Sequence, residues 1–109
     1  MEVEIKKKGK GKITLYTLPY CSHCQEIKLL LNQHKIPFNE IDIDTNPALG
    51  DTIEEKLKTE SYPIIYFQKK PGEFIYLLSE TDLVKLNNIR IFNTIDEALE
   101  ILLQYYYEI

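Results

Sequence analysis

Residues 12–34, KITLYTLPYCSHCQEIKLLLNQH, contain both cysteines of the chain and predict how the fold begins. Residues 12–18 are β-branched and aromatic, which predicts a buried strand that ends at Pro19. From Ser22 to about His34 the apolar residues recur at helical spacing, which predicts a helix of roughly three turns. Cys21 and Cys24 are therefore expected where the strand ends and the helix begins.

Downstream of this unit, strand and helix patterns continue to alternate. The predicted elements are a half-buried strand at 38–44, a helix from Pro47 to about Thr59 that Gly50 weakens slightly, and two strands of a hairpin, 63–67 and 73–78. Two capping boxes, Ser79 with Asp82 and Thr94 with Glu97, predict a short helix through Leu86 and an additional helix at the C-terminus. This order predicts an α/β fold with a four-stranded mixed sheet flanked by helices.

Charge divides the chain into a basic leader and an acidic body. The first twelve residues contain five lysines and two glutamates, so the net charge of -4 becomes -7 for the rest of the 109 residues. We expect a flexible leader at 1–11 and one folded domain at 12–109. Without a long apolar segment or an export signal, the expectation is a cytoplasmic monomer that binds neither membrane nor nucleic acid.

The cysteine pair is expected to be chemically active. A helix N-terminus stabilises an anion, and thiols in CxxC segments there have pKa values of about 3.5 to 7.5 in place of about 8.5. We expect Cys21 to attack a substrate disulfide and Cys24, one turn further into the helix, to resolve the mixed disulfide. When protonated, His23 would stabilise the thiolate and favour the reduced form; alternatively, it is a solvent-facing residue without coupling to the thiols.

A close cysteine pair can also bind zinc, form a structural disulfide or ligate an iron–sulfur cluster. A structural zinc ion needs about four ligands, and His34 is too far along the helix from Cys24 to join them, so no metal site is expected within the chain. A structural disulfide that closes so short a loop would stabilise little. An iron–sulfur cluster that takes Cys21 from each of two subunits remains open as an alternative.

In ITLYTLPYCSHCQEIK, in the IDID strand with its acidic helix, and in SYPIIYF, the chain resembles glutaredoxins, small members of the thioredoxin superfamily. The resemblance covers about residues 12–86 and implies a thioredoxin-like fold in which Pro63 is cis and packs beside Cys21. The alternative for Pro63 is a trans residue at the start of an edge strand. The resemblance also implies that Tyr62 offers its backbone to a peptide or to glutathione.

Further site residues follow from the same resemblance. Thr81 and Asp82 match the family position that receives the charged end of glutathione, although they also fit simple helix capping. Lys28 falls where the family often has a basic residue, and Tyr20, directly before the first cysteine, is expected to contact the substrate. Three departures weaken the match to glutathione: Leu18 replaces a basic residue, Leu78 and Ser79 replace Gly-Gly, and Ser-His replaces the usual Pro-Tyr between the cysteines.

These observations predict a glutaredoxin-like thiol–disulfide oxidoreductase of cell redox homeostasis and electron transport. It would reduce disulfides in proteins or mixed disulfides with glutathione, without a tightly bound cofactor, and would be recycled by glutathione or a thioredoxin reductase. Two alternatives stay open: an iron–sulfur cluster carrier, and a non-catalytic thioredoxin-fold interaction module.

Overall fold

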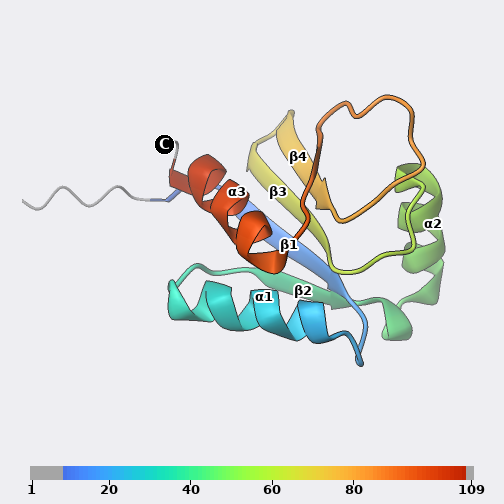
Figure 1. Cartoon of the computed structure of the whole chain (residues 1–109), viewed down its shortest axis with the longest axis horizontal. Helices are drawn as coiled ribbons and strands as arrows, with labels where there is room; N and C mark the ends of the chain where they lie inside the picture. The colour runs from blue at the N-terminus through green and yellow to red at the C-terminus, as the bar shows by residue number, and fades with distance from the viewer. Residues whose placement is uncertain (1–8, 108–109) are drawn as a thin grey trace, which may run out of the picture.

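The computed structural model describes residues 9–107, which form a five-stranded mixed sheet with three α-helices (Figure 1). The chain passes through β1 (Lys12–Thr17), α1 (Ser22–Gln33), β2 (Asn39–Asp42), the 3₁₀ turn η1 (Ile43–Thr45), α2 (Pro47–Leu57), β3 (Ile64–Lys70), β4 (Glu73–Leu78), β5 (Ile89–Ile91) and α3 (Ile95–Tyr107). The strands lie in the order β2-β1-β3-β4-β5. Strand β1 is parallel to β2 and antiparallel to β3, and β4 is parallel to β5.

Two apolar clusters hold the helices against the sheet, one on each face. Because side chains alternate along a strand, Ile65 and Phe67 of β3 belong to the cluster formed with α1 and α3, whereas Ile64 belongs to the cluster formed with α2. Helices α1 and α3 also contact each other. The N-terminal end of α1 and the whole of α2 lie at the same end of the molecule (Figure 1).

The α/β fold class is confirmed, and the sheet has five strands where four were predicted. The predicted helix at 79–86 is wrong: those residues form an irregular connection to β5. This connection is bonded to the end of α2, since Asp82 N donates to Lys58 O at 2.9 Å and the Thr81 hydroxyl donates to Leu57 O. The capping box at Thr94 does open the C-terminal helix, α3, where Glu97 N donates to Thr94 Oγ1 at 3.1 Å.

Smaller differences concern the ends of strands. The strand predicted at 38–44 ends at Asp42, whose Oδ1 accepts from Asp44 N at 2.9 Å and so begins the turn η1. Strand β3 continues to Lys70, and Gly72, with φ 86°, lies in the turn that follows it. Glycine adopts this left-handed conformation readily, which explains the tight hairpin between β3 and β4.

Only part of the predicted leader can be compared with the structure. Residues 1–8 lie outside the described residues, while Lys10 N donates to Tyr106 O at 2.9 Å and Gly9 lies against the Tyr106 ring. Tyr105 packs against Phe67 with a centroid distance of 6.1 Å, and Tyr105, Tyr106 and Tyr107 all pack against the core cluster on the α1 and α3 face. Within residues 9–107, no helix combines the length and apolar character needed to cross a membrane.

Candidate redox site

Cys21 is the N-cap of α1, and its position follows directly from the strand that precedes it. Strand β1 ends at Thr17, and a turn in which Cys21 N donates to Leu18 O at 3.3 Å leads into the helix. The Cys21 backbone is extended (φ -95°, ψ 109°), and its sulfur accepts from Cys24 N at 3.0 Å. The N–H of Cys24, which has no acceptor within the helix, therefore points at the Cys21 sulfur, and this arrangement stabilises a thiolate.

The two cysteines differ in exposure and are joined in a disulfide. Cys24 is 0% exposed and packs inside the fold, whereas Cys21 is partly accessible. The disulfide joins Cys21 and Cys24, whose Cα atoms are 5.2 Å apart. The relative exposure is the one expected of an attacking and a resolving thiol, because only an accessible sulfur can reach a substrate disulfide.

The loop before β3 lies against the disulfide. The Tyr62–Pro63 peptide bond is cis, as the resemblance implied, and Pro63 is buried. The carbonyl oxygen of Tyr62 lies 3.6 Å from Cys21 Sγ, a distance at which a thiol can donate a weak hydrogen bond. Residues 41 positions apart in the sequence thus meet at the reactive sulfur.

At its other end, Tyr62 is bonded to α2. Its hydroxyl donates to Glu54 Oε2 at 2.6 Å. Burial raises the pKa of Tyr62 well above its ordinary value, and the bond to the Glu54 carboxylate raises it further. The hydroxyl therefore stays protonated near neutral pH and remains a donor.

A hollow of about 370 Å³ opens beside the disulfide. It is lined by His23, Ser61, Tyr62, Ser79, Glu80, Phe92, Asn93, Thr94 and Ile95. The last four residues form the connection from β5 to α3 and the first residue of α3, and sequence reasoning did not assign them to the site. The capping box at Thr94 was visible in the sequence, but its place beside His23 depends on β5, which was not predicted.

Thr81 and Asp82 line a second, larger hollow, of about 440 Å³, which we call the acidic hollow. Its walls are Asp51, Glu54, Glu55, Lys58, Thr59, Glu60, Ser61, Glu80, Thr81 and Asp82. Ser61 and Glu80 also line the first hollow, so the two adjoin. Of the predicted site residues, His23 and Tyr62 line the first hollow and Thr81 and Asp82 line the acidic hollow. Neither lining includes Cys21, Cys24, Pro63 or Tyr20, which is 99% exposed.

Lys28 pairs with a carboxylate one turn below Cys24. Its Nζ lies 2.9 Å from Glu40 Oε2, and the same oxygen accepts from the hydroxyl of buried Thr17 at 2.7 Å. The bond from Lys28 and the bond from Thr17 lower the pKa of Glu40. The expected basic residue is therefore present, but it links α1 to β1 and β2.

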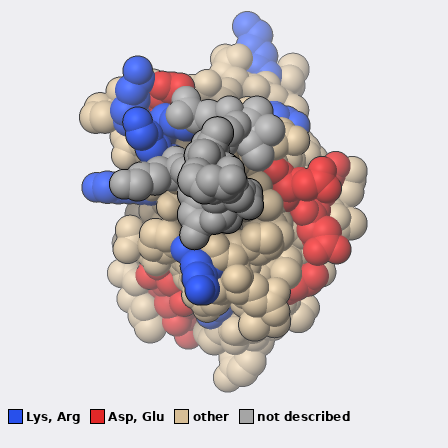
Figure 2. Space-filling model, turned by 90° about the vertical axis from the view of Figure 1, so that its left-hand side faces the viewer, with Lys and Arg blue, Asp and Glu red and all other residues tan. Residues whose placement is uncertain are grey.

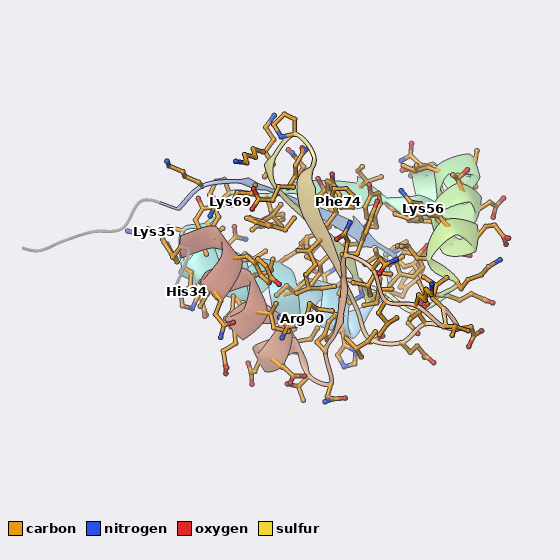
Figure 3. All side chains as sticks on the ribbon, turned by 90° about the horizontal axis from the view of Figure 1, so that it is seen from above. His34, Lys35, Lys56, Lys69, Phe74 and Arg90 are labelled. Atoms are coloured by element: carbon orange, nitrogen blue, oxygen red, sulfur yellow. A yellow bond between two sulfur atoms is a disulfide. The ribbon has the colours of Figure 1, made fainter. Side chains whose placement is uncertain are left out.

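The charged residues are unevenly distributed over the molecule. Six carboxylates line the acidic hollow at the α2 end, where Lys58 is paired with Glu55. Figure 2 shows Lys and Arg side chains together with Asp and Glu around the opposite end, and Figure 3 places His34, Lys35 and Lys69 there. Among residues 9–107, no group of three or more His, Cys, Asp or Glu side chains is arranged to hold a metal ion.

The chain is similar to known proteins in both sequence and structure. A sequence model of the family described as glutaredoxin matches residues 13–71, more than half of the chain, including both cysteines and Pro63. The crystal structure of the thioredoxin-like protein BC3987 superposes with a TM-score of 0.51 at 21% identity, over 84% of this chain and 99% of that one. This likeness shows the fold.

Curated relatives match a shorter stretch. The global transcriptional regulator Spx 1 of Oceanobacillus iheyensis is 41% identical over 46 residues, and Spx of Bacillus subtilis is 39% identical over 46 residues. In both cases the match covers 42% of this chain and 35% of the relative. The chain therefore spans about a third of the length of these regulators.

Proposed function

The chain belongs to the glutaredoxin family, and from this premise we propose that it is a thiol–disulfide oxidoreductase that reduces disulfides of protein substrates. A thiol-redox role follows from the family, the thioredoxin-like fold and the Cys21–Cys24 pair. The observation that carries the proposal is the placement of Cys21 Sγ, which accepts from Cys24 N at 3.0 Å and faces the Tyr62 carbonyl at 3.6 Å.

The proposed reaction begins from the reduced dithiol. The Cys21 thiolate attacks one sulfur of the substrate disulfide, the substrate S–S bond breaks, and the departing thiolate takes a proton from solvent. Cys24 then loses its proton and attacks Cys21 Sγ, which forms the intramolecular disulfide and releases the second substrate thiol. Two electrons have passed to the substrate, and an external dithiol or two thiols must return them.

The surroundings of the disulfide favour a protein substrate over glutathione. Glutathione carries two carboxylates, and the acidic hollow beside the site contains six carboxylates with one lysine among its walls. Like charges at close range disfavour binding. Leu18 adds to this effect, because it offers no positive charge near Cys21. We therefore propose that proteins with basic residues near their disulfide are the substrates and that a thioredoxin reductase is the reductant.

A parallel assay tests the proposal. The reduced protein is offered an insulin-type protein disulfide, with either glutathione and its reductase or a thioredoxin reductase system as the source of electrons. We expect turnover with the protein disulfide that is faster in the thioredoxin reductase arm. Absence of turnover in both arms would remove the catalytic proposal, and fast turnover in the glutathione arm alone would remove the proposed reductant.

A second candidate function is a non-catalytic module that responds to its own thiol state. The identity of 41% over 46 residues with a protein named as a transcriptional regulator favours it. This function needs the Cys21–Cys24 disulfide to form and break, but it needs no turnover. A protein that cycles with oxidant and reductant yet never reduces a second disulfide would be of this kind.

A further inference from the structure

Glu54 of α2 bonds to the loop that carries Tyr62 at two points. The peptide oxygen of Glu54 accepts from the backbone N–H of Lys58 and from Thr59 N, the latter at 3.2 Å. The carboxylate of the same residue accepts from the Tyr62 hydroxyl at 2.6 Å. Glu54 therefore fixes both the beginning of the loop and the side chain near its end.

Tyr62 connects this anchor to the reactive sulfur. Its hydroxyl lies on Glu54, while its carbonyl oxygen lies 3.6 Å from Cys21 Sγ. The ring is only half-buried and packs at the margin of the α2 cluster, so packing alone holds it weakly. A short hydrogen bond to a carboxylate is among the stronger protein hydrogen bonds and restricts the ring to one position.

We infer that Glu54 is a positioning residue of the redox site: by holding the Tyr62 hydroxyl, it keeps the Tyr62 carbonyl opposite Cys21 and the substrate-facing loop in place. The inference rests on the proposed function, since the loop is a platform only if a substrate disulfide binds at Cys21. Glu54 touches neither the sulfur nor the substrate and acts through Tyr62.

Two measurable consequences follow from this arrangement. A carbonyl that accepts from the Cys21 thiol favours the neutral form, so a loosened loop makes the thiolate easier to form. A loosened loop also has to be ordered each time a substrate binds, which weakens binding more than it slows the chemical step. A purely structural role for Glu54 would lower stability without changing either property.

The test uses the full chain with four single substitutions. Tyr62→Phe removes the donor, Glu54→Ala removes the acceptor, and Glu54→Gln keeps an acceptor without the charge. Tyr62→Phe is decisive, because it removes the hydroxyl and leaves every charge of α2 in place. Tyr105→Phe is the matched control, since it removes the hydroxyl of a tyrosine on α3, away from the redox site. That hydroxyl accepts from Arg90 of β5 at 3.4 Å.

We expect Tyr62→Phe to raise KM for a peptide disulfide about three- to tenfold with kcat changed less than about twofold, the pattern of lost binding. The rate of Cys21 alkylation at pH 6 is expected to rise about two- to fivefold, because alkylation follows the thiolate fraction. Glu54→Ala should shift both values in the same direction, Glu54→Gln should shift them less because it keeps a neutral acceptor, and Tyr105→Phe should stay within about twofold of the parent protein. The double variant Tyr62→Phe with Glu54→Ala should be no worse than Tyr62→Phe, since both remove one bond.

The possible outcomes separate the two proposals. If the parent protein reduces disulfides and Tyr62→Phe changes neither KM nor alkylation, Glu54 has no positioning role. The same conclusion follows if Glu54→Gln is as impaired as Glu54→Ala while Tyr62→Phe is normal, because the charge alone would then matter. If the parent protein turns over no disulfide, the proposed function fails, and the alkylation rates still report whether Glu54 and Tyr62 set the state of Cys21.

Discussion

Cys21 has two roles, helix cap and nucleophile, that usually belong to two different side chains. It is the N-cap of α1, with its sulfur bonded to Cys24 N, and it is the proposed nucleophile. Serine is among the best N-cap residues and alanine among the poorest. A substitution at this position can therefore change the helix, the chemistry, or both.

We predict that Cys21→Ser and Cys21→Ala both abolish disulfide reduction but differ in stability. Cys21→Ser keeps an acceptor for Cys24 N, whereas Cys21→Ala loses the cap, so its free energy of unfolding should be lower by about 1 kcal/mol. Urea denaturation of both variants beside the reduced parent protein measures this difference. Residual reduction by Cys21→Ser would transfer the role of nucleophile to Cys24.

His23 is the residue between the cysteines whose charge can act on them. We predict that His23→Ala raises the pKa of the Cys21 thiol and lowers the reduction potential by about 10–30 mV, because a positive neighbour that favours the thiolate is gone. The pH dependence of alkylation and equilibration with a glutathione redox buffer measure the two changes. Unchanged values would make His23 a solvent-facing residue of the hollow that it lines.

Among the contacts between elements, the Thr17–Glu40–Lys28 cluster joins β1, β2 and α1. Its bonds lower the pKa of Glu40, so the ionised form stabilises the fold at neutral pH. That contribution is complete above the unfolded-state pKa and is lost as the pH falls through the lower pKa of the folded state.

We predict that Glu40→Gln costs about 0.5–1 kcal/mol at pH 7, a modest value because the Glu40 side chain is 35% exposed. The difference from the parent protein should shrink as the pH falls through the lowered pKa of Glu40, because the parent carboxylate then becomes protonated as well. Urea denaturation over a series of acidic pH values is the measurement. Thr17→Val, which keeps the charges and removes the buried hydroxyl, should cost about 1 kcal/mol at pH 7.

Helix α2 contains a glycine that propensity alone would replace. Alanine is better than glycine in a helix by about 1 kcal/mol, yet Gly50 is buried and a Cβ there would collide with the Ile43 side chain of η1. We predict that Gly50→Ala lowers stability by about 1–3 kcal/mol, because overpacking outweighs propensity. Thermal denaturation tests the sign, and Thr52→Ala, at an exposed position of the same helix, is the control.

The elements that the sequence predicted well are those with local signals. The apolar spacing after Ser22, the Pro47 start and the Thr94–Glu97 box correspond to α1, α2 and α3. Strand β5 has three residues and no pattern of its own, so only pairing with β4 defines it. The capping box at Ser79 did not predict a helix correctly, because Thr81 bonds to the end of α2, and that contact depends on tertiary structure.

The same distinction applies to the site. Cys21, Cys24 and His23 are adjacent in sequence, and SYPIIYF identified Tyr62 and the cis Pro63 through family resemblance. The wall of the hollow at 92–95 could not be predicted, because it reaches His23 only through β5. The acidic hollow likewise collects residues from α2 and two loops that no sequence spacing connects.

At the scale of the whole molecule, the charge distribution predicts how substrates approach. Carboxylates line the acidic hollow, which adjoins the hollow beside the disulfide, so a cationic disulfide is attracted to this end of the molecule and an anionic one is repelled. We predict that a peptide disulfide flanked by lysines has a kcat/KM about tenfold higher than its glutamate-flanked counterpart at low salt. The ratio should fall toward about two at 1 M salt, where screening is strong. A ratio that is independent of salt would mean that the hollow has no part in selection.

The backbone bond between Lys10 and Tyr106 places the first described residues beside the last helix, and Figure 1 shows both at the end of the molecule away from the start of α1. An electrode, a bead or a dye attached to the exposed side chain of Lys10 would thus leave the disulfide facing the solution. Voltammetry of the tethered protein can then read the dithiol couple directly, without a mediator competing for Cys21.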